Sequence, residues 1–221
     1  AMPTIPTNPT HHRPWQPQGT VYGTLLNFRR EWDLWAPRMT QDPHKAAPNA
    51  PILYVKSANT FSLAGQDLLL QDSVSEVDIG ATLGLVIGDD AQVAGAVLLC
   101  DWSVPHASYY RPPVKFRCCD GFLALPQQVT TGQVADWAAL QIEVRRNGDR
   151  VQTVNLNELM RDLPTLLTDV GEFMTLQAGD VLMVGTDGLA DGTRPRAKAG
   201  DRVEISAPGF DSVNVTVGGV A

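Results

Sequence analysis

The sequence lacks the features of a disulfide-stabilised or zinc-binding protein. It has only three cysteines, an odd number, and two of them, Cys118 and Cys119, are adjacent. This pattern argues against a disulfide framework and favours reduced thiols in a cytoplasmic protein. A zinc site is not expected, because further ligands at regular spacing are missing.

Long hydrophobic runs and basic clusters are missing as well. No stretch reaches the roughly 18 apolar residues typical of a membrane-spanning helix, and the first twenty residues contain no apolar signal segment. The formal net charge is −7 and no run of Lys and Arg is present, so we expect neither a membrane nor a nucleic acid as partner. GxSxG, P-loop and GxGxxG motifs are also missing, so hydrolase, kinase and dehydrogenase functions have no support.

The chain divides into a short arm and one domain. Residues 1–18 are rich in Pro, Thr and His, which predicts a flexible N-terminal arm. Residues 19–221 read as a single domain of many short strands with no βαβ repeat. That pattern predicts a strand-dominated α+β fold with mixed or antiparallel sheets.

A few local signals are clear within this domain. Two alternating runs flank Asn147-Gly148, which predicts a β-hairpin with an Asn-Gly turn. Residues 29–39 read as a short helix that carries two tryptophans, and residues 156–176 as an amphipathic helix. Pro164 either interrupts the second helix or starts a further segment.

The centre of the chain contains the most apolar segments. Residues 77–88, VDIGATLGLVIG, alternate and then become wholly apolar, as a strand entering a buried sheet does. Residues 95–104 predict a second buried strand. Residues 106–126 are too polar and too broken by proline for the core, and we expect a long loop there of the kind that carries functional sites.

Four motifs in these segments resemble the fumarylacetoacetate hydrolase family, in order and spacing. They are VDIGATLGLVIG (77–88), GAVLLCDWS (95–103), RCCDGFLALP (117–126) and LQAGDVLMVGTDGL (176–189). The resemblance implies a β-roll of mixed sheets with a few short helices, in a protein that is usually a dimer.

One branch of the family resembles the chain most. Residues 108–122 are similar to a stretch of the bifunctional isomerase/decarboxylases of 4-hydroxyphenylacetate (homoprotocatechuate) breakdown, which are built from two homologous halves. Residues 79–82 resemble the N-terminal-type half, which reads S-G-A-T where other members carry E-x-E. The resemblance implies isomerisation of 2-hydroxyhepta-2,4-diene-1,7-dioate or decarboxylation of 5-carboxymethyl-2-oxo-hex-3-ene-1,7-dioate, which makes the ligand a small dicarboxylate 2-oxo acid.

Family members hold Mg²⁺ or Mn²⁺ through three carboxylates, and the metal stabilises the enolate of a 2-oxo acid. The resemblance places the ligand positions at Gly80, Thr82 and Asp101, of which only Asp101 is a carboxylate. We therefore expect no metal or weak metal binding. Asp101 either faces the cavity or caps a turn. Glu76 and Asp78 share this strand face, but each step of two residues along a strand shifts the side chain by about 6–7 Å. This shift moves Asp78 out of reach of a metal at the family's ligand positions, so we expect both carboxylates to be solvated charges at the edge of the sheet.

The family's acid/base pair is also altered. Its His and Glu positions fall on Glu31 and Leu34, so the proton-transferring dyad is missing and the catalytic residues are not identified. The other family positions are candidates for binding a substrate, each with a structural alternative such as a surface charge or a strand-end turn. These candidates are Lys56, Asp101, Tyr110, Arg111, Arg117 and Thr186.

Arg117 replaces a family lysine. An arginine can grip a carboxylate through two hydrogen bonds but cannot release its proton, so it could bind but not act as a base. Asp120 is expected to pair with Arg117 or to cap a turn, and Lys115 is a second candidate cation.

Two functions remain open from the sequence. The chain is either a catalytic subunit of such an isomerase/decarboxylase or a metal-free partner that scaffolds an active, metal-binding paralogue. It would accordingly be a homodimer or a heteromer. Loss of the glutamates together with the dyad favours the second function physically.

Overall fold

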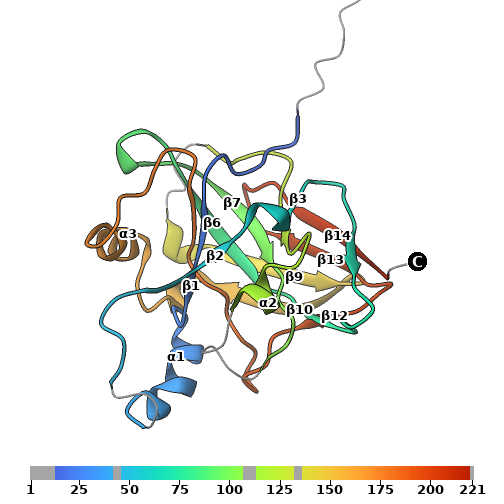
Figure 1. The fold of residues 1–221 in the computed structure, drawn as a ribbon, viewed down its shortest axis with the longest axis horizontal. Helices are drawn as coiled ribbons and strands as arrows, with labels where there is room; N and C mark the ends of the chain where they lie inside the picture. The colour runs from blue at the N-terminus through green and yellow to red at the C-terminus, as the bar shows by residue number, and fades with distance from the viewer. Residues whose placement is uncertain (1–12, 42–45, 107–112, 132–135, 220–221) are drawn as a thin grey trace, which may run out of the picture.

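The structure is a computed structural model that describes residues 13–41, 46–106, 113–131 and 136–219 (Figure 1). Fourteen strands and three α-helices make up this part of the chain. The strands are β1 (Val21–Leu25), β2 (Ile52–Lys56), β3 (Phe61–Ser62), β4 (Leu68–Leu70), β5 (Val77–Asp78), β6 (Ala81–Ile87), β7 (Val93–Asp101), β8 (Leu123–Ala124), β9 (Gln141–Arg146), β10 (Asp149–Asn155), β11 (Val181–Met183), β12 (Arg196–Ala197), β13 (Arg202–Ser206) and β14 (Val213–Gly219). The helices are α1 (Arg29–Trp35), α2 (Pro113–Arg117) and α3 (Leu163–Gly171).

The larger sheet has seven strands in the order β2-β1-β11-β6-β7-β8-β3. Its centre is the antiparallel pair β6 and β7, in which Thr82 lies opposite Leu99. β1 runs parallel to β11, and β3 runs parallel to β8, so the sheet is mixed. Because β11 comes from the late part of the chain, it brings residues 181–186 beside β6, the strand that begins directly after Gly80.

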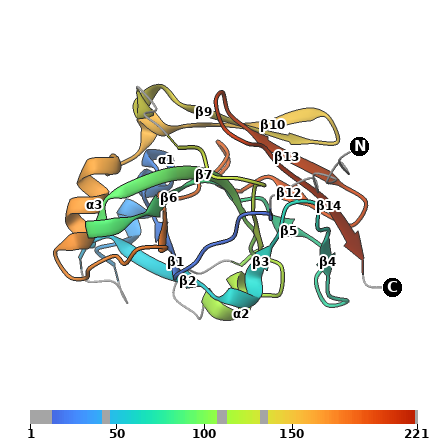
Figure 2. The ribbon, with the colours of Figure 1, turned by 90° about the horizontal axis from the view of Figure 1, so that it is seen from above.

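The second sheet has five strands in the order β10-β9-β13-β14-β4. Asn147 and Gly148 connect β9 to β10 with φ of 54° and 86°, the left-handed conformation that a two-residue type I′ turn requires. The predicted hairpin is therefore confirmed. Figure 2 shows this sheet lying across one face of the larger sheet.

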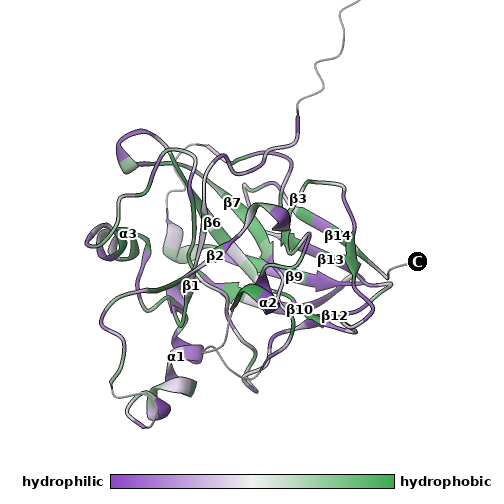
Figure 3. Ribbon diagram, viewed as in Figure 1, coloured by the Kyte–Doolittle hydropathy of each residue, from purple (hydrophilic) through white to green (hydrophobic). Residues whose placement is uncertain are grey.

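The core lies between the two sheets. Leu85 and Leu98 of the larger sheet belong to the same buried cluster as Ile142 and Ile205 of the smaller one. Figure 3 shows the strands of this interior as the most hydrophobic part of the chain. A second cluster, which includes Leu99, covers the opposite face of the larger sheet, and Trp15 packs against it.

Residues 77–88 do not form the single strand that the sequence predicts. β5 pairs with β12 in a separate two-stranded sheet, and β6 begins only at Ala81. The break falls at Ile79 and Gly80, where the Ile79 N–H donates to the carbonyl of Pro195 instead of to a neighbouring strand. The strand prediction was wrong at this point because an apolar pattern indicates that a segment is buried but does not indicate which strand it pairs with.

Two other predicted segments differ from the structure. The helix expected over residues 156–176 begins at Leu163, because Asp162 caps it by accepting from the Thr165 N–H at 3.0 Å and Pro164 occupies its first turn. The segment 106–126 is not simply a polar loop. Its described part contains α2 and the buried strand β8, and Phe122 is 2% exposed.

None of the helices in the described ranges is long and apolar enough to cross a membrane.

Candidate functional site

The candidate site lies where three strand ends meet. Asp101 ends β7, Gly80 precedes β6, and Thr186 follows β11. The Asp101 N–H donates to the Gly80 carbonyl at 2.8 Å. A Cβ atom built on Gly80 would overlap the carbonyl oxygen of Asp101 and lie 3.1 Å from Thr186 Cγ2. The two strand ends therefore approach so closely that only glycine fits between them.

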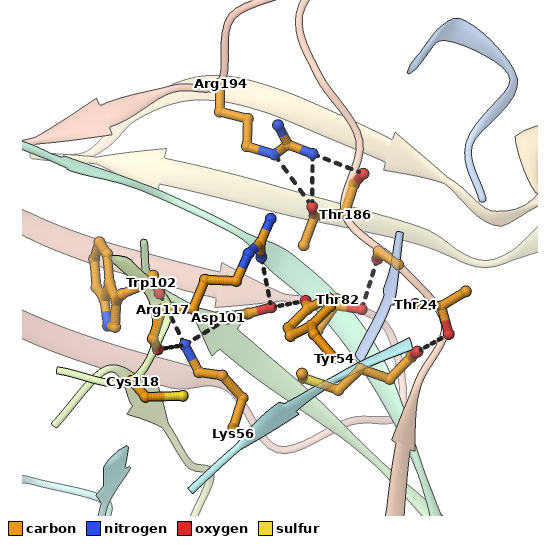
Figure 4. A network of polar contacts seen from close by, with 12 residues as sticks. Thr24, Tyr54, Lys56, Thr82, Asp101, Trp102, Arg117, Cys118, Thr186 and Arg194 are labelled. Atoms are coloured by element: carbon orange, nitrogen blue, oxygen red, sulfur yellow. Dashed lines mark hydrogen bonds and ion pairs between the residues drawn. The ribbon is translucent and has the colours of Figure 1, made fainter. Parts of the chain in front are cut away.

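Asp101 is the centre of a buried polar cluster. Its Oδ1 lies 2.7 Å from Lys56 Nζ, and both side chains are fully buried. Its Oδ2 accepts a hydrogen bond from the Tyr54 hydroxyl and lies 3.7 Å from Arg117 Nη1. Figure 4 shows these side chains converging on Asp101 from different elements. We call Asp101, Lys56, Tyr54 and Arg117 the Asp101 cluster.

Lys56 uses all of its hydrogen-bonding capacity inside the protein. Besides the Asp101 carboxylate, the ammonium donates to the carbonyl oxygens of Trp102, at 2.9 Å, and Arg117. An ammonium has three hydrogens, so none is left for a ligand. The alternative that Lys56 is a surface residue is wrong, since the residue is 1% exposed.

The charges in this cluster depend on one another. Burial acts to raise the pKa of Asp101, but the charges of Lys56 and Arg117 and the hydrogen bonds outweigh it and hold this pKa below its usual value. Burial lowers the pKa of Lys56 while Asp101 opposes the shift. Burial and the Asp101 charge together raise the pKa of Tyr54 far above its usual value, so its phenol stays neutral and donates.

Arg117 is the member of the cluster whose side-chain donors make no hydrogen bond to the described residues. The residue is 4% exposed, and its guanidinium carbon lies 4.3 Å from the centre of the Tyr54 ring. Within the described ranges, its guanidinium donates no hydrogen bond, because the contact to Asp101 is too long for one. Figure 4 shows the guanidinium beside the Asp101 carboxylate, on the side of Thr186 and Arg194.

A second group of polar side chains adjoins this cluster. Arg194 lies 2.9 Å from Glu31 Oε1 and donates from Nε and Nη2 to Thr186 Oγ1, at 3.1 and 3.0 Å. All three residues are largely buried. The charge of Arg194 also reaches the Tyr54 hydroxyl, where it acts to lower the pKa.

Sequence reasoning missed Arg194. The loop that carries it has no periodicity, and its partner Glu31 is more than 160 residues away in the chain. Glu31 was identified only as the position of a lost histidine. The one available signal is weak: a charged residue in a Gly-rich loop that follows a buried strand.

Two adjoining pockets open beside Arg194. One of about 280 Å³ also contacts Glu31, and the other, of about 390 Å³, contacts His106. Leu34 and Trp35 line both pockets, so α1 forms their shared wall. Leu34, the other position of the family dyad, is 52% exposed here and carries no titratable group.

The remaining predicted residues lie apart from this arrangement or outside the described ranges. Asp120 accepts from Asn59 Nδ2 at 2.9 Å, so the expected pairing with Arg117 is wrong. Asp78 is not a freely solvated charge, because it lies 3.2 Å from Arg196 Nε with its side chain only 14% exposed. Tyr110 and Arg111 lie outside the described residues.

Comparison with known proteins gives the family. A family model described as fumarylacetoacetate (FAA) hydrolase C-terminal matches residues 20–218, nearly the whole chain. The chain belongs to the fumarylacetoacetate hydrolase family. The 4-hydroxyphenylacetate degradation bifunctional isomerase/decarboxylase of Escherichia coli is 32% identical to it over 203 residues, which are 87% of this chain and 46% of that protein. The chain thus spans about half the length of the curated relatives it matches.

Solved structures of the family share the fold. The fumarylacetoacetate hydrolase of Exiguobacterium antarcticum superposes with a TM-score of 0.71 at 22% identity, over 94% of this chain and 78% of that one. The 5-carboxymethyl-2-hydroxymuconate delta-isomerase of Mycobacterium smegmatis does so with a TM-score of 0.71 at 20% identity, over 91% and 77%. The strand-dominated α+β fold with mixed sheets is therefore confirmed.

Members of the fumarylacetoacetate hydrolase family generally use a divalent metal, but the residues at the family's ligand positions in this chain do not fit one. Gly80 has neither a side chain nor room for one. Thr82 donates its hydroxyl hydrogen to the Gly185 carbonyl at 2.7 Å. Asp101 is already neutralised by Lys56. Across the described ranges, no three His, Cys, Asp or Glu side chains gather as a metal site would need. That the chain binds no metal stays a prediction.

Proposed function

We propose that this chain is the metal-free half of an isomerase/decarboxylase of aromatic catabolism that acts on small dicarboxylate 2-oxo acids. The half would associate with a paralogous, metal-binding half, either as a separate subunit or within a larger protein. The resemblance of the chain to one half of the 4-hydroxyphenylacetate enzymes supports this proposal.

The single observation that carries the proposal is the Lys56–Asp101 ion pair. A carboxylate that would bind a metal must be free to face it, whereas this one is enclosed by an ammonium, a phenol and a guanidinium. Two charged residues near Asp101 and Thr186 are also poor proton-transfer groups. Arg117 cannot release a proton, and Glu31 is engaged by Arg194.

A second candidate function is a metal-independent isomerase. The observation that favours it is Arg117, whose buried guanidinium lies 3.7 Å from Asp101 and donates no hydrogen bond to the described residues. A fixed positive group in a water-excluded site can stabilise an enolate, as an oxyanion hole does.

Turnover measurements separate the two functions. The purified chain is assayed by ultraviolet absorbance with 2-hydroxyhepta-2,4-diene-1,7-dioate, alone in excess EDTA and mixed with a family paralogue that carries the paired glutamates. Turnover only in the mixture, at a rate above that of the paralogue alone, is the expected result. Turnover by the isolated chain in EDTA would establish the second function. Both functions would be contradicted if the isolated chain showed no turnover and no mixture exceeded the rate of the paralogue alone.

A further inference from the structure

Cys118 and Cys119 play no part in the proposed function. Both are half-buried free thiols that follow α2 directly, whereas Cys100, the third cysteine, is completely buried. Cys118 Sγ lies 3.2 Å from the Val55 carbonyl oxygen, and Cys119 Sγ lies 3.3 Å from that of Lys115. A thiol is a weak hydrogen-bond donor, so these contacts do not hold either sulfur firmly.

Cys119 can be reached from solvent by a small molecule. It lines a cavity of about 450 Å³, whose wall also includes Phe61 of β3, Leu69 of β4 and Phe122. The cavity has ample room for a molecule the size of hydrogen peroxide. Phe122 connects it with the Asp101 cluster, because the Phe122 ring centre lies 5.9 Å from Lys56 Nζ.

The peptide group that links the two cysteines is held by few hydrogen bonds. Its N–H, which belongs to Cys119, donates to no other described residue. Its carbonyl, which belongs to Cys118, accepts from Asn59 Nδ2 at 2.8 Å. The helix has already ended at Arg117, and β8 begins only at Leu123. This peptide can therefore rotate without breaking a helix or a sheet.

A disulfide between neighbouring residues is strained. Successive Cα atoms are about 3.8 Å apart, whereas most disulfides join Cα atoms about 4.4–6.8 Å apart. Such a bond gives no useful cross-link to the fold, and its strain makes it easy to reduce. An adjacent pair of accessible thiols is therefore suited to reversible oxidation rather than to a permanent disulfide.

We propose that Cys118 and Cys119 are a site of reversible oxidation by small peroxides, at which they form a disulfide with each other. The Cys118 thiolate attacks one oxygen of hydrogen peroxide, the O–O bond breaks, and the other oxygen leaves as water after taking up the thiol proton. Cys118 is then a sulfenic acid.

Cys119 completes the reaction. Its sulfur attacks the Cys118 sulfur, the S–O bond breaks, and the hydroxyl group leaves as water with the Cys119 proton. Two thiols are thus oxidised, and one peroxide is reduced to two water molecules. Burial raises the pKa of the Cys119 thiol, which fits the second of the two roles.

Oxidation at this site reaches the Asp101 cluster through the backbone. The Arg117 carbonyl, which accepts from Lys56 Nζ, belongs to the peptide group directly before Cys118. Asn59 donates to both the Cys118 carbonyl and Asp120 Oδ1. Figure 4 shows Cys118 beside Lys56. Rotation of the peptide between the cysteines removes the Asn59 contact and displaces the Arg117 carbonyl, so the oxidised chain holds Lys56 less firmly and is less stable.

Peptide mapping of the full chain tests the site. The reduced protein is treated with hydrogen peroxide at neutral pH, alkylated, digested with trypsin and analysed by mass spectrometry. Trypsin cleaves after Arg117, so both thiols lie in the peptide that begins at Cys118. We expect this peptide to be lighter by two hydrogen atoms and to take up no alkylating reagent. Before treatment, or after dithiothreitol, it should take up two equivalents.

Thermal unfolding tests the link to Lys56. The midpoint of the oxidised chain should be lower by about 2–6 °C and should return with dithiothreitol. Cys100→Ala is the matched control for the disulfide, and it should oxidise as the wild type does because Cys100 is buried. The double variant Cys118→Ala/Cys119→Ala should show no shift of its midpoint with peroxide. In Cys119→Ala, dimedone should trap Cys118 as the sulfenic acid.

The proposal is overturned if the peptide keeps both thiols under conditions that fully oxidise glutathione, or if it gains oxygen atoms without forming a disulfide. It is equally overturned if the disulfide joins two chains, which a non-reducing gel detects, or if Cys100→Ala no longer forms it. A disulfide that leaves the midpoint unchanged contradicts the link to Lys56. None of these measurements involves turnover, so their outcome is independent of the proposed function.

Discussion

Lys56 Nζ and Asp101 Oδ1 lie 2.7 Å apart, and neither side chain is exposed to solvent. The pair joins the end of β2, at one edge of the larger sheet, to the end of β7 near its other edge. In a buried ion pair the desolvation of both charges largely offsets their attraction, so the pair adds little net stability, but the loss of one partner is severe. This asymmetry makes the pair testable.

Replacing Lys56 by Met should lower the free energy of unfolding by about 3–5 kcal/mol, because Asp101 would lose the ammonium that neutralises it. Two backbone carbonyls would lose a donor at the same time. Urea denaturation at neutral pH measures the change.

The control is Lys115→Met, in which an exposed lysine of α2 is replaced by the same residue. It should change stability by no more than about 0.5 kcal/mol. An equal loss in the two variants would show that Lys56 is not held by a structural ion pair.

Replacing Arg117 by Met should be far less costly. Asp101 keeps its contacts to Lys56 and Tyr54 and loses only the more distant of its two neighbouring cations. The lost stacking on Tyr54 is worth about 0.5–2 kcal/mol, so we expect a change of at most about 2 kcal/mol in either direction. A loss as large as that of Lys56→Met, in parallel urea titrations, would show that Asp101 depends on Arg117 as much as on Lys56.

Gly80→Ala should destabilise the protein by at least about 1–3 kcal/mol, as overpacking does. The added Cβ would overlap the Asp101 carbonyl oxygen, so the two strand ends would have to separate. Gly171→Ala is the matched control, since nothing lies within 4 Å of a Cβ at this position of α3. That change should be neutral or stabilising by up to about 1 kcal/mol. Similar thermal midpoints for the two variants would contradict the close approach.

Asp187 gives a prediction about pH. Burial raises the pKa of this carboxyl, which is 7% exposed and accepts from the Gly188 N–H at 2.8 Å. The folded state therefore keeps the proton to a higher pH than the unfolded state, in which the pKa is about 3.9. Stability contributed by this group is fully present below about pH 4 and declines as pH rises through the folded pKa.

Asp187→Asn keeps an oxygen for Gly188 and removes the titration. The variant should therefore be more stable than the wild type at pH 7 and about equal to it at pH 3. Urea midpoints at the two pH values measure the difference, with the exposed Asp72→Asn as control. A difference that does not depend on pH would contradict the raised pKa.

Most of the fold could be predicted from the sequence because strands and turns leave local signals. The Asn147-Gly148 turn needs two left-handed residues, and this dipeptide is the usual way to provide them. The break at Gly80 could not be predicted in this way. It depends on β12, whose residues lie nearly 120 positions further along the chain.

The candidate site was predicted in part. Family motifs identified Asp101, Arg117 and Thr186, which the structure brings to the same strand ends. The motifs could not show that all three ammonium hydrogens of Lys56 are used inside the protein. Two of their three acceptors are backbone carbonyls, which every residue carries whatever its side chain. Nor could the motifs identify Arg194, since its role depends on a loop packing against α1.

The close approach at Gly80 also limits what one substitution can achieve. A glutamate introduced at this position would not provide a cation ligand, because its Cβ would overlap the Asp101 carbonyl oxygen unless the two backbones separated. Building a metal site here would therefore require a rearranged backbone in addition to new carboxylates.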